Sequence, residues 1–369
     1  MSRLLFSLLF LPFVLSGTPM ESPCDPIDRT FQSINDQTPA CRCFQDSPGV
    51  SGDVWIGCSG HQMPAVFDSL LKLNESTATL SRLHIWDSLI NIIPADMFSK
   101  VRPRSLTIER AELALLRDGA FTTISSVLKD LSLRKNILKR LEPTILKELV
   151  KLQSLDVSGN RITTLNGEEI GEVTQLTHLN MADNEMDCIE DGTFIGSPNI
   201  KILNLRGNKL TKITNMTFKG LSNLEQLDLS KNELKDIDWG AFSELKQLRV
   251  LDLGTNRLSH IQLRGLNHLV KLFINNNSIL TLKHVSLRDL PSLSLLNIDR
   301  NSITTIGEND LFGLATSTKL VSLSLASNNI SVITPRAFTP VSSISILALQ
   351  NNELKSLSYE TEPWLSPLK

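Results

Sequence analysis

Apolar residues recur along this chain with a period of about 24 residues, which fits neither a long helix nor a long strand. The clearest unit, Leu224 to Phe242, has apolar residues at positions 1, 4, 6, 11, 14 and 19. Alternate residues of a strand share a face, so Leu227 and Leu229 point to the same side. Each unit therefore predicts a short strand, a tight turn at the asparagine of position 9 (Asn232 here) and an irregular return.

Twelve such units follow one another from residue 80 onward. They begin at Leu80, Pro103, Leu128, Leu152, Leu176, Ile200, Leu224, Leu248, Leu269, Leu293, Leu320 and Ile344. Ten of them have asparagine at position 9, whereas the first two have Ser88 and Ala111. A single unit cannot bury its own apolar side, so the copies must stack into a solenoid. A ladder of asparagine side chains should be weakest at the first two units.

This pattern resembles the leucine-rich repeat family, in the 24-residue form of secreted and cell-surface proteins. The phrases Asp118–Phe121 and Asp191–Phe194 are typical of that form, and the resemblance extends from about Cys24 to Leu357. It implies an α/β repeat fold: a leucine-rich repeat solenoid over residues 80–369, with a parallel sheet on its concave side and an irregular convex face. Leucine and isoleucine dominate and aromatic residues make up only 5%, as stacked leucine columns require.

Two segments precede the repeats. Residues 1–16 predict a signal peptide, because Arg3 is followed by an apolar run, Leu4 to Leu15, that is too short to span a bilayer. A buried N-terminal helix is the alternative. We expect the chain to be secreted to the extracellular space or matrix, and we expect residues 17–79 to form a cap over the first repeat.

The cap contains four cysteines: Cys24, Cys41, Cys43 and Cys58. In an oxidising compartment they should form two disulfides, and their spacing leaves three pairings open. The resemblance to the N-terminal cysteine cap of extracellular leucine-rich repeat proteins implies Cys24–Cys43 and Cys41–Cys58. The alternative is a zinc site completed by His61, which secretion disfavours because thiols oxidise there.

A fifth cysteine, Cys188, predicts a partly buried thiol, with an intermolecular disulfide as the alternative. Extracellular members of the family often close with a second cysteine cap, but no cysteine follows Cys188 in this sequence. Either Trp364 and Leu365 fold over the last coil, or the chain is a shortened form of something longer.

Four asparagines begin Asn-x-Ser/Thr triplets and are predicted glycosylation sites: Asn74, Asn215, Asn276 and Asn329. Asn215 falls on the convex return of its unit. Asn276 falls at the rim of the concave sheet, where a glycan would crowd a ligand. Its neighbour Asn277 stands at position 9 and should be buried.

Neither an enzyme nor a cofactor is predicted. The sequence has no Gly-x-Ser-x-Gly, phosphate-binding loop or His-Glu-x-x-His motif. Asp228 and Asp252 share position 5 in adjacent units and could form a carboxylate pair that acts in catalysis or binds a cation. The alternative is structural, because a short polar residue also suits a crowded parallel strand. We expect no metal.

The net charge of −2 gives no overall field that would attract nucleic acid or a membrane. No later apolar run is long enough to span a bilayer.

A ligand should bind the N-terminal part of the concave face. Residues 100–151 carry twelve Lys or Arg against six Asp or Glu, a local charge of +6. With the first unit, the candidate ligand-binding residues are Arg82, His84, Trp86, Arg104, Arg110, Lys129, Arg134 and Lys135. Tryptophan beside arginine is the composition of binding hot spots. The alternative is a solvated basic rim, and a second candidate surface is the apolar strip of Ile202, Val250, Phe273 and Leu295.

These features predict a secreted, non-enzymatic binding protein that recognises an extracellular protein or a matrix glycan through its concave surface. The alternative is the ectodomain, or a shed decoy, of a leucine-rich repeat signalling receptor. An inhibitor of a secreted enzyme is a third possibility. The sequence does not identify the ligand.

Overall fold

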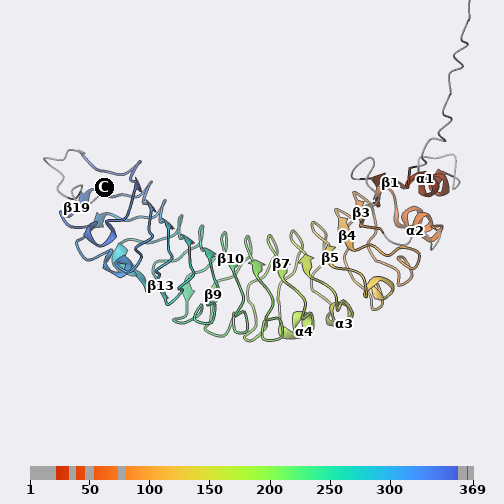
Figure 1. Ribbon diagram of the computed structural model, residues 1–369, viewed down its shortest axis with the longest axis horizontal. Coiled ribbons are helices and arrows are strands. Elements are labelled where there is room, and N and C mark those ends of the chain that lie inside the picture. Colours follow the sequence, from red (N-terminus) through yellow and green to blue (C-terminus); the bar gives the residue numbers. More distant parts are fainter. Residues whose placement is uncertain (1–21, 33–38, 46–53, 74–79, 356–363, 365–369) are drawn as a thin grey trace, which may run out of the picture.

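The computed structural model describes residues 22–32, 39–45, 54–73, 80–355 and 364 of the 369-residue chain. The predicted signal peptide and the acceptor Asn74 lie outside the described residues. The described residues form a curved solenoid with a long parallel sheet along its concave side and loops, short helices and short strands on its convex side (Figure 1). The predicted fold class is confirmed.

Fourteen strands build the concave sheet within the described ranges, two from the cap and twelve from the repeats. In order they are β1 (Cys41–Gln45), β2 (Val54–Ser59), β3 (Arg82–Trp86), β4 (Ser105–Glu109), β5 (Asp130–Ser132), β6 (Ser154–Asp156), β7 (His178–Asn180), β8 (Ile202–Asn204), β10 (Gln226–Asp228), β12 (Val250–Asp252), β14 (Lys271–Phe273), β16 (Leu295–Asn297), β18 (Ser322–Ser324) and β20 (Ile346–Ala348). Each repeat strand pairs in parallel with the next in strict register, so Leu227 lies between Leu203 and Leu251.

The convex side carries shorter elements. Six short strands pair there as β9 (Lys212–Ile213) with β11 (Asp236–Ile237), β13 (Ile261–Arg264) with β15 (Val285–Arg288), and β17 (Thr305–Ile306) with β19 (Val332–Ile333). The helices are α1 (Asp25–Gln32) and α2 (Met63–Leu71) in the cap, α3 (Pro143–Glu148) and α4 (Gly167–Ile170) on the returns, and the 3₁₀ turns η2 (Thr122–Ile124), η3 (Leu282–His284), η4 (Phe312–Leu314) and η5 (Thr339–Val341).

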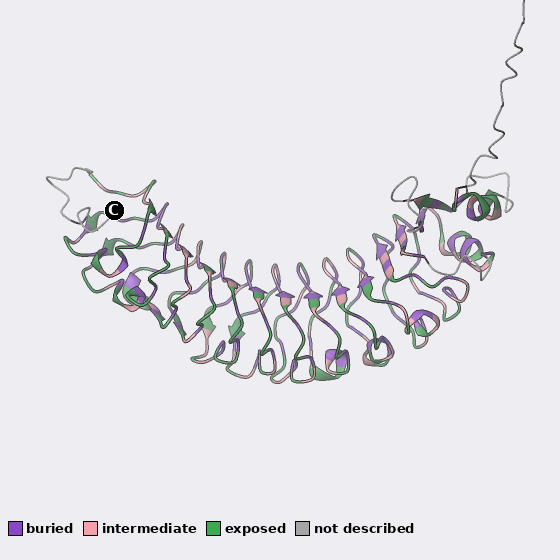
Figure 2. Ribbon diagram, in the orientation of Figure 1, coloured by how far each residue is buried: buried purple, intermediate pink, exposed green. Residues whose placement is uncertain are grey.

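The core runs the whole length of the solenoid between the concave strands and the convex returns (Figure 2). Leucine and isoleucine columns fill it, and Leu227, Leu229 and Leu234 of the unit that starts at Leu224 are each no more than 1% exposed. Phenylalanines at position 19 stack between successive coils, with Phe218 lying 6.2 Å from Phe194 and 5.9 Å from Phe242 between ring centroids. Each unit therefore buries its apolar side only through its neighbours.

The asparagine of position 9 ties each coil to the preceding one. Asn232, which is 7% exposed, accepts a hydrogen bond at Oδ1 from the backbone N–H of Leu210 in the preceding unit (3.1 Å). Its Nδ2 donates to the carbonyls of Leu205 in the preceding unit and Leu229 in its own unit, both at 3.0 Å. Position 8, immediately before it, has a positive φ in every unit, for example 55° at Lys231. The amide thus satisfies backbone groups that this left-handed turn removes from the strand ladder.

The expected weakness at the first two units is offset by longer strands. Asn136, the first asparagine of the ladder, makes the same kinds of bonds as Asn232, with Oδ1 accepting from Ala111 and Leu113 and Nδ2 donating to Ile108 (2.8 Å). Ser88 donates to a carbonyl of its own unit instead. However, β3 and β4 pair over five residues, whereas later repeat strands pair over three.

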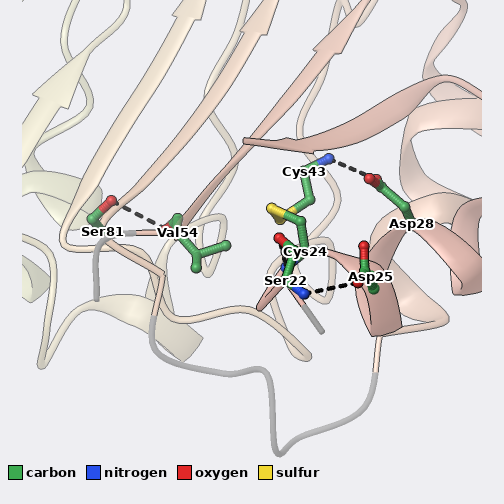
Figure 3. Close-up of a disulfide and its surroundings, with 7 residues drawn as sticks. All are labelled: Ser22, Cys24, Asp25, Asp28, Cys43, Val54 and Ser81. Atoms are coloured by element: carbon green, nitrogen blue, oxygen red, sulfur yellow. Dashed lines mark hydrogen bonds between the residues drawn. A yellow bond between two sulfur atoms is a disulfide. The ribbon is translucent and has the colours of Figure 1, made fainter. Parts of the chain in front are cut away.

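The cap is held by the two disulfides that the family resemblance implied, Cys24–Cys43 and Cys41–Cys58, with Cα atoms 5.3 and 4.1 Å apart. The carboxylate of Asp28 on α1 accepts a hydrogen bond from the backbone N–H of Cys43 at 2.9 Å (Figure 3). β2 pairs in parallel with β3, while β1 pairs antiparallel with β2. The cap therefore extends the concave sheet by two strands and ends its parallel run.

Near the C-terminal end, one aromatic side chain folds back onto the repeats. Trp364 is 1% exposed, and its ring lies 5.6 Å from that of Phe338. The ring therefore packs against the penultimate unit, while Leu347 and Leu349 of the last unit stay half-exposed, and Leu365 lies outside the described residues.

We expect Cys43→Ser to destabilise the cap by about 2–5 kcal/mol, because it removes the bridge between α1 and β1. The secreted yield should fall, and thermal unfolding should begin at a lower temperature. A mutant that is secreted normally and melts as the wild type does would contradict this role.

We expect Asn232→Ala and Asn136→Ala to cost similar amounts, about 1–3 kcal/mol each, because each leaves buried backbone groups of two coils without partners. Chemical denaturation of the purified protein measures both. Asn223→Ala is the control, since this exposed asparagine donates a single hydrogen bond at the surface, to the carbonyl of Pro198. Losses at the ladder positions no larger than at Asn223 would refute the structural role.

Candidate functional site

An aromatic surface lies on the concave face where the cap meets the repeats. Alternate residues of a strand share a face, and the strand register sets Phe44 opposite Trp55, and Trp55 opposite Arg82. Phe44 and Trp55 stack with ring centroids 4.3 Å apart, the guanidinium of Arg82 lies 5.3 Å above Trp55, and His84 lies 4.6 Å from Trp86. We call these five side chains the aromatic platform.

A glycine allows the three rings of the platform to pack close together. Gly57 lies on β2 between the rings, and a Cβ at this position would stand 2.8 Å from Phe44, 2.9 Å from Trp86 and 3.0 Å from Trp55. Real Cβ atoms essentially never approach so closely, so a larger residue would push the rings apart. Sequence reasoning missed Phe44 and Trp55. The alternation of buried and outward residues in Val54–Ser59 puts Trp55 and Gly57 on one face, and this pattern could have indicated Trp55.

Beside the platform, the carboxylate of Glu109 contacts three of the predicted site residues. Glu109, at the end of β4, has a side chain that is only 5% exposed. Its oxygens lie 2.5 Å from Arg134 Nε, 3.1 Å from Arg110 Nη1 and 3.4 Å from His84 Nε2. Arg110 also pairs with Asp87 at 2.6 Å. Two carboxylates thus face two guanidiniums, and the formal charge of this cluster cancels when His84 is neutral.

The environment lowers the pKa of both Glu109 and His84. Burial works against ionisation of Glu109, but the hydrogen bond and charge of Arg134, together with Arg110 and His84, hold the pKa of its carboxyl below the ordinary value. Burial lowers the pKa of His84, and the attraction of Glu109 only partly offsets this. The cluster is therefore an anion between two arginines beside an imidazole that resists protonation.

The structure separates the predicted basic residues into two groups. Arg104 and Lys129 immediately precede β4 and β5, whereas Arg110 and Lys135 stand at position 8, beyond the other ends of the concave strands. Six residues of extended chain span about 20 Å, so the two groups lie on opposite rims of the sheet. Arg82, His84 and Trp86 join the platform, and Arg110 and Arg134 meet at Glu109.

The second candidate surface is discontinuous. Ile202, Val250 and Leu295 share one row across the sheet, but Gln226 and Lys271 interrupt it, and Phe273 belongs to a different row. Polar and charged side chains between the apolar ones make this strip a weaker candidate than the platform.

Three predicted glycosylation sites are exposed: Asn215, Asn276 and Asn329. Asn276 contacts the hydroxyl of Thr255 at 3.2 Å near the concave rim. Asn277 donates and accepts ladder hydrogen bonds as predicted, but it is half-buried rather than buried.

The aspartate column at position 5 has a structural explanation. Asp228 and Asp252 each accept, at Oδ1, the N–H of the residue two positions later, and asparagines at the same position in other units do the same. Within the described residues no group of three or more His, Cys, Asp or Glu side chains could hold a metal. These carboxyls therefore shape the turn that leads to the ladder asparagine.

Two further observations concern the described part of the chain. Cys188 is exposed rather than partly buried, because its side chain lies at the surface of a convex return. None of the helices described is long and apolar enough to cross a membrane.

The fold defines a repeat solenoid with a continuous concave sheet. The sequence matches the family model described as Leucine rich repeat over residues 102–162, 126–186, 151–210, 198–258 and 267–321, which is more than half of the chain. The chain belongs to the leucine-rich repeat family.

Known proteins share parts of this architecture. P-granule-associated novel protein 1 of Caenorhabditis elegans is 36% identical over 160 residues, which are 42% of this chain and 26% of that protein. The chain therefore spans about a quarter of the length of this curated relative. A chain in the crystal structure of a TLR13–ssRNA13 complex superposes with a TM-score of 0.68 at 25% identity, over 81% of this chain and 47% of that one.

A chain of the octameric complex of Latrophilin 3, Unc5D and FLRT2 gives a TM-score of 0.58 at 20% identity, over 90% of this chain and 91% of that one. At this identity the likeness establishes the shared fold alone.

We expect Glu109→Gln to destabilise the protein by about 1 kcal/mol at pH 7, a modest value because the partner arginines are about 42% exposed. The native pKa of Glu109 is below its ordinary 4.5, so its stabilisation is complete above that pH and is lost as the pH falls through the lower native value. The difference in melting temperature between wild type and mutant should therefore shrink on acidification below pH 4.5.

Glu172→Gln serves as the control for this experiment, since the side chain of Glu172 is 64% exposed and lies 3.8 Å from Lys147. A difference between wild type and Glu109→Gln that stays constant from neutral to acid pH would contradict the ionised state of Glu109.

Proposed function

We propose that this chain is a secreted, non-enzymatic binding protein and that the aromatic platform is the centre of its binding surface. The platform sets Phe44, Trp55 and Trp86 beside an arginine on the concave face, and this observation carries the proposal. Binding energy at protein interfaces concentrates in tryptophan, tyrosine and arginine side chains. Two disulfides and the absence of a membrane-spanning helix from the described residues are consistent with an extracellular location.

The charge distribution favours a protein as the partner over a sulfated matrix glycan. Glu109 and Asp87 neutralise Arg110 and Arg134, which removes two cations from the predicted basic surface. A glycan polyanion needs a run of accessible cations, whereas rings and one guanidinium suit a partner with apolar and acidic side chains. Arg104, Lys129 and Lys135 on the rims then supply longer-range attraction that salt screens over about 8 Å.

The second candidate is the ectodomain, or a shed decoy, of a signalling receptor. The chain covers only 47% of the chain in the TLR13 complex and 26% of P-granule-associated novel protein 1. Longer proteins therefore contain a solenoid like this one as one part. The same concave surface would serve either role.

Purified secreted protein, cross-linked in extracellular extract and analysed by mass spectrometry, tests the proposal. Trp86→Ala combined with Arg82→Ala should reduce capture of the specific partners tenfold or more, since hot-spot losses are about 2 kcal/mol. Phe312→Ala is the control, because this phenylalanine is 68% exposed on the convex side. Cross-links on the convex side, or capture that the double mutant leaves unchanged, would refute the platform.

Heparin chromatography of Arg134→Glu with Lys135→Glu separates the two partner classes. We expect a small change in the salt concentration at elution, because Arg134 is already paired with Glu109. A large fall in that concentration together with unchanged protein capture would make a sulfated glycan the principal partner.

A further inference from the structure

A pocket of about 470 Å³ opens on the convex side between the coils that contain β11 and β13. The unit that starts at Leu248 has 21 residues, three fewer than the unit before it. The convex pairing of β9 with β11 stops there, and a separate pair, β13 with β15, begins on the other side of the pocket. The shorter return of this unit coincides with the break between the two convex strand pairs and with the pocket.

The walls of the pocket are aromatic on one side and open on the other. The stack of Phe194, Phe218 and Phe242 ends at Phe242, which lines the pocket. Across from it, Gly265 has a φ of 72°, and a Cβ at that position would meet nothing within 4 Å. Trp239 also lines the pocket and is 69% exposed.

The strand register brings a predicted glycosylation site to the same pocket. Ile213 pairs with Ile237 in the β9–β11 ladder, so two residues further on Asn215 and Trp239 occupy equivalent places on adjacent coils. Both side chains line the pocket. Asn215 is exposed and begins the triplet Asn215–Thr217, whose threonine hydroxyl accepts a hydrogen bond from the N–H of Thr214.

We propose that Asn215 carries an N-linked glycan whose first N-acetylglucosamine residues lie in this pocket against the ring of Trp239. In the attachment, Nδ2 of Asn215 forms a bond to C1 of a sugar supplied by a lipid diphosphate-linked oligosaccharide. The bond from C1 to the diphosphate oxygen breaks, the lipid diphosphate leaves, and the amide nitrogen loses one proton. The inference rests on the secretion included in the proposed function, but on none of its binding residues.

The chemistry of the pocket suits this sugar. The C–H face of N-acetylglucosamine can cover the exposed indole, which presents a large apolar surface to solvent. Its acetamide and hydroxyl groups can reach polar side chains that also line the pocket: Lys246 on the coil of Trp239, and Gln262 and Arg264 on the next coil. Arg264 is held in place by Asp289 at 3.0 Å. The glycan would thus cover the pocket that the shorter return leaves open.

Full-length protein secreted from glycosylating cells tests the inference in two measurements. Glycopeptide mass spectrometry should find Asn215 occupied. Acrylamide quenching of tryptophan fluorescence, with Trp239→Phe used to assign the contribution of Trp239, should then show that this ring is protected. The protection should be lost in Asn215→Gln, and lost again when an amidase removes the glycan and converts Asn215 to aspartate.

Trimming the glycan to its first N-acetylglucosamine should leave the protection in place, because that sugar is the one expected on the ring. Asn329→Gln is the matched control and should leave the quenching of Trp239 unchanged, since Asn329 lies on a different return, where it pairs with Glu353. An unoccupied Asn215, or quenching that is the same with and without its glycan, would overturn the inference. Either result leaves the binding role of the aromatic platform untouched.

Discussion

The hydrogen bonds of one side-chain amide, repeated at position 9, support the rest of this structure. Every unit turns through a left-handed residue at position 8, which takes backbone groups out of the strand ladder. The amide of Asn232 accepts from and donates to the preceding coil while also donating to its own. Because the turn cannot be satisfied without the neighbouring coil, the asparagine couples local geometry to stacking. Leucine columns then follow as the only arrangement that buries the apolar side.

This coupling makes the N-terminal end of the solenoid special, since the first repeat has no earlier repeat to stack on. At the N-terminal end the ladder stops at Asn136, and five-residue strands with a disulfide-held cap continue the sheet. The candidate site is a consequence of the way in which the cap continues the sheet. The same strands that close the sheet, β1 and β2, carry Phe44 and Trp55 onto the concave face beside the first repeat.

The repeated features were predictable from the sequence because each position recurs about twelve times, so periodicity alone shows which residues face the core. The turn at Asn232 and the parallel register were therefore correct. Features that occur once were not visible. Glu109 joins Arg110 to Arg134 only because register brings neighbouring coils together. Phe44 lies outside the repeats, and its place opposite Trp55 depends on an antiparallel pairing that no periodicity indicates.

The same contrast explains why a count of charges was a poor guide to the site. Residues 100–151 carry a net formal charge of +6, but a count does not show where the cations lie: Arg110 and Arg134 meet at Glu109, whereas Arg104 and Lys129 lie on the opposite rim. What remains exposed at the centre is aromatic, and Gly57 keeps it tightly packed. In a solenoid, departures from the repeat therefore mark the places where a surface differs from its neighbours: a glycine among the rings at the cap, and three missing residues beside Trp239 on the convex side.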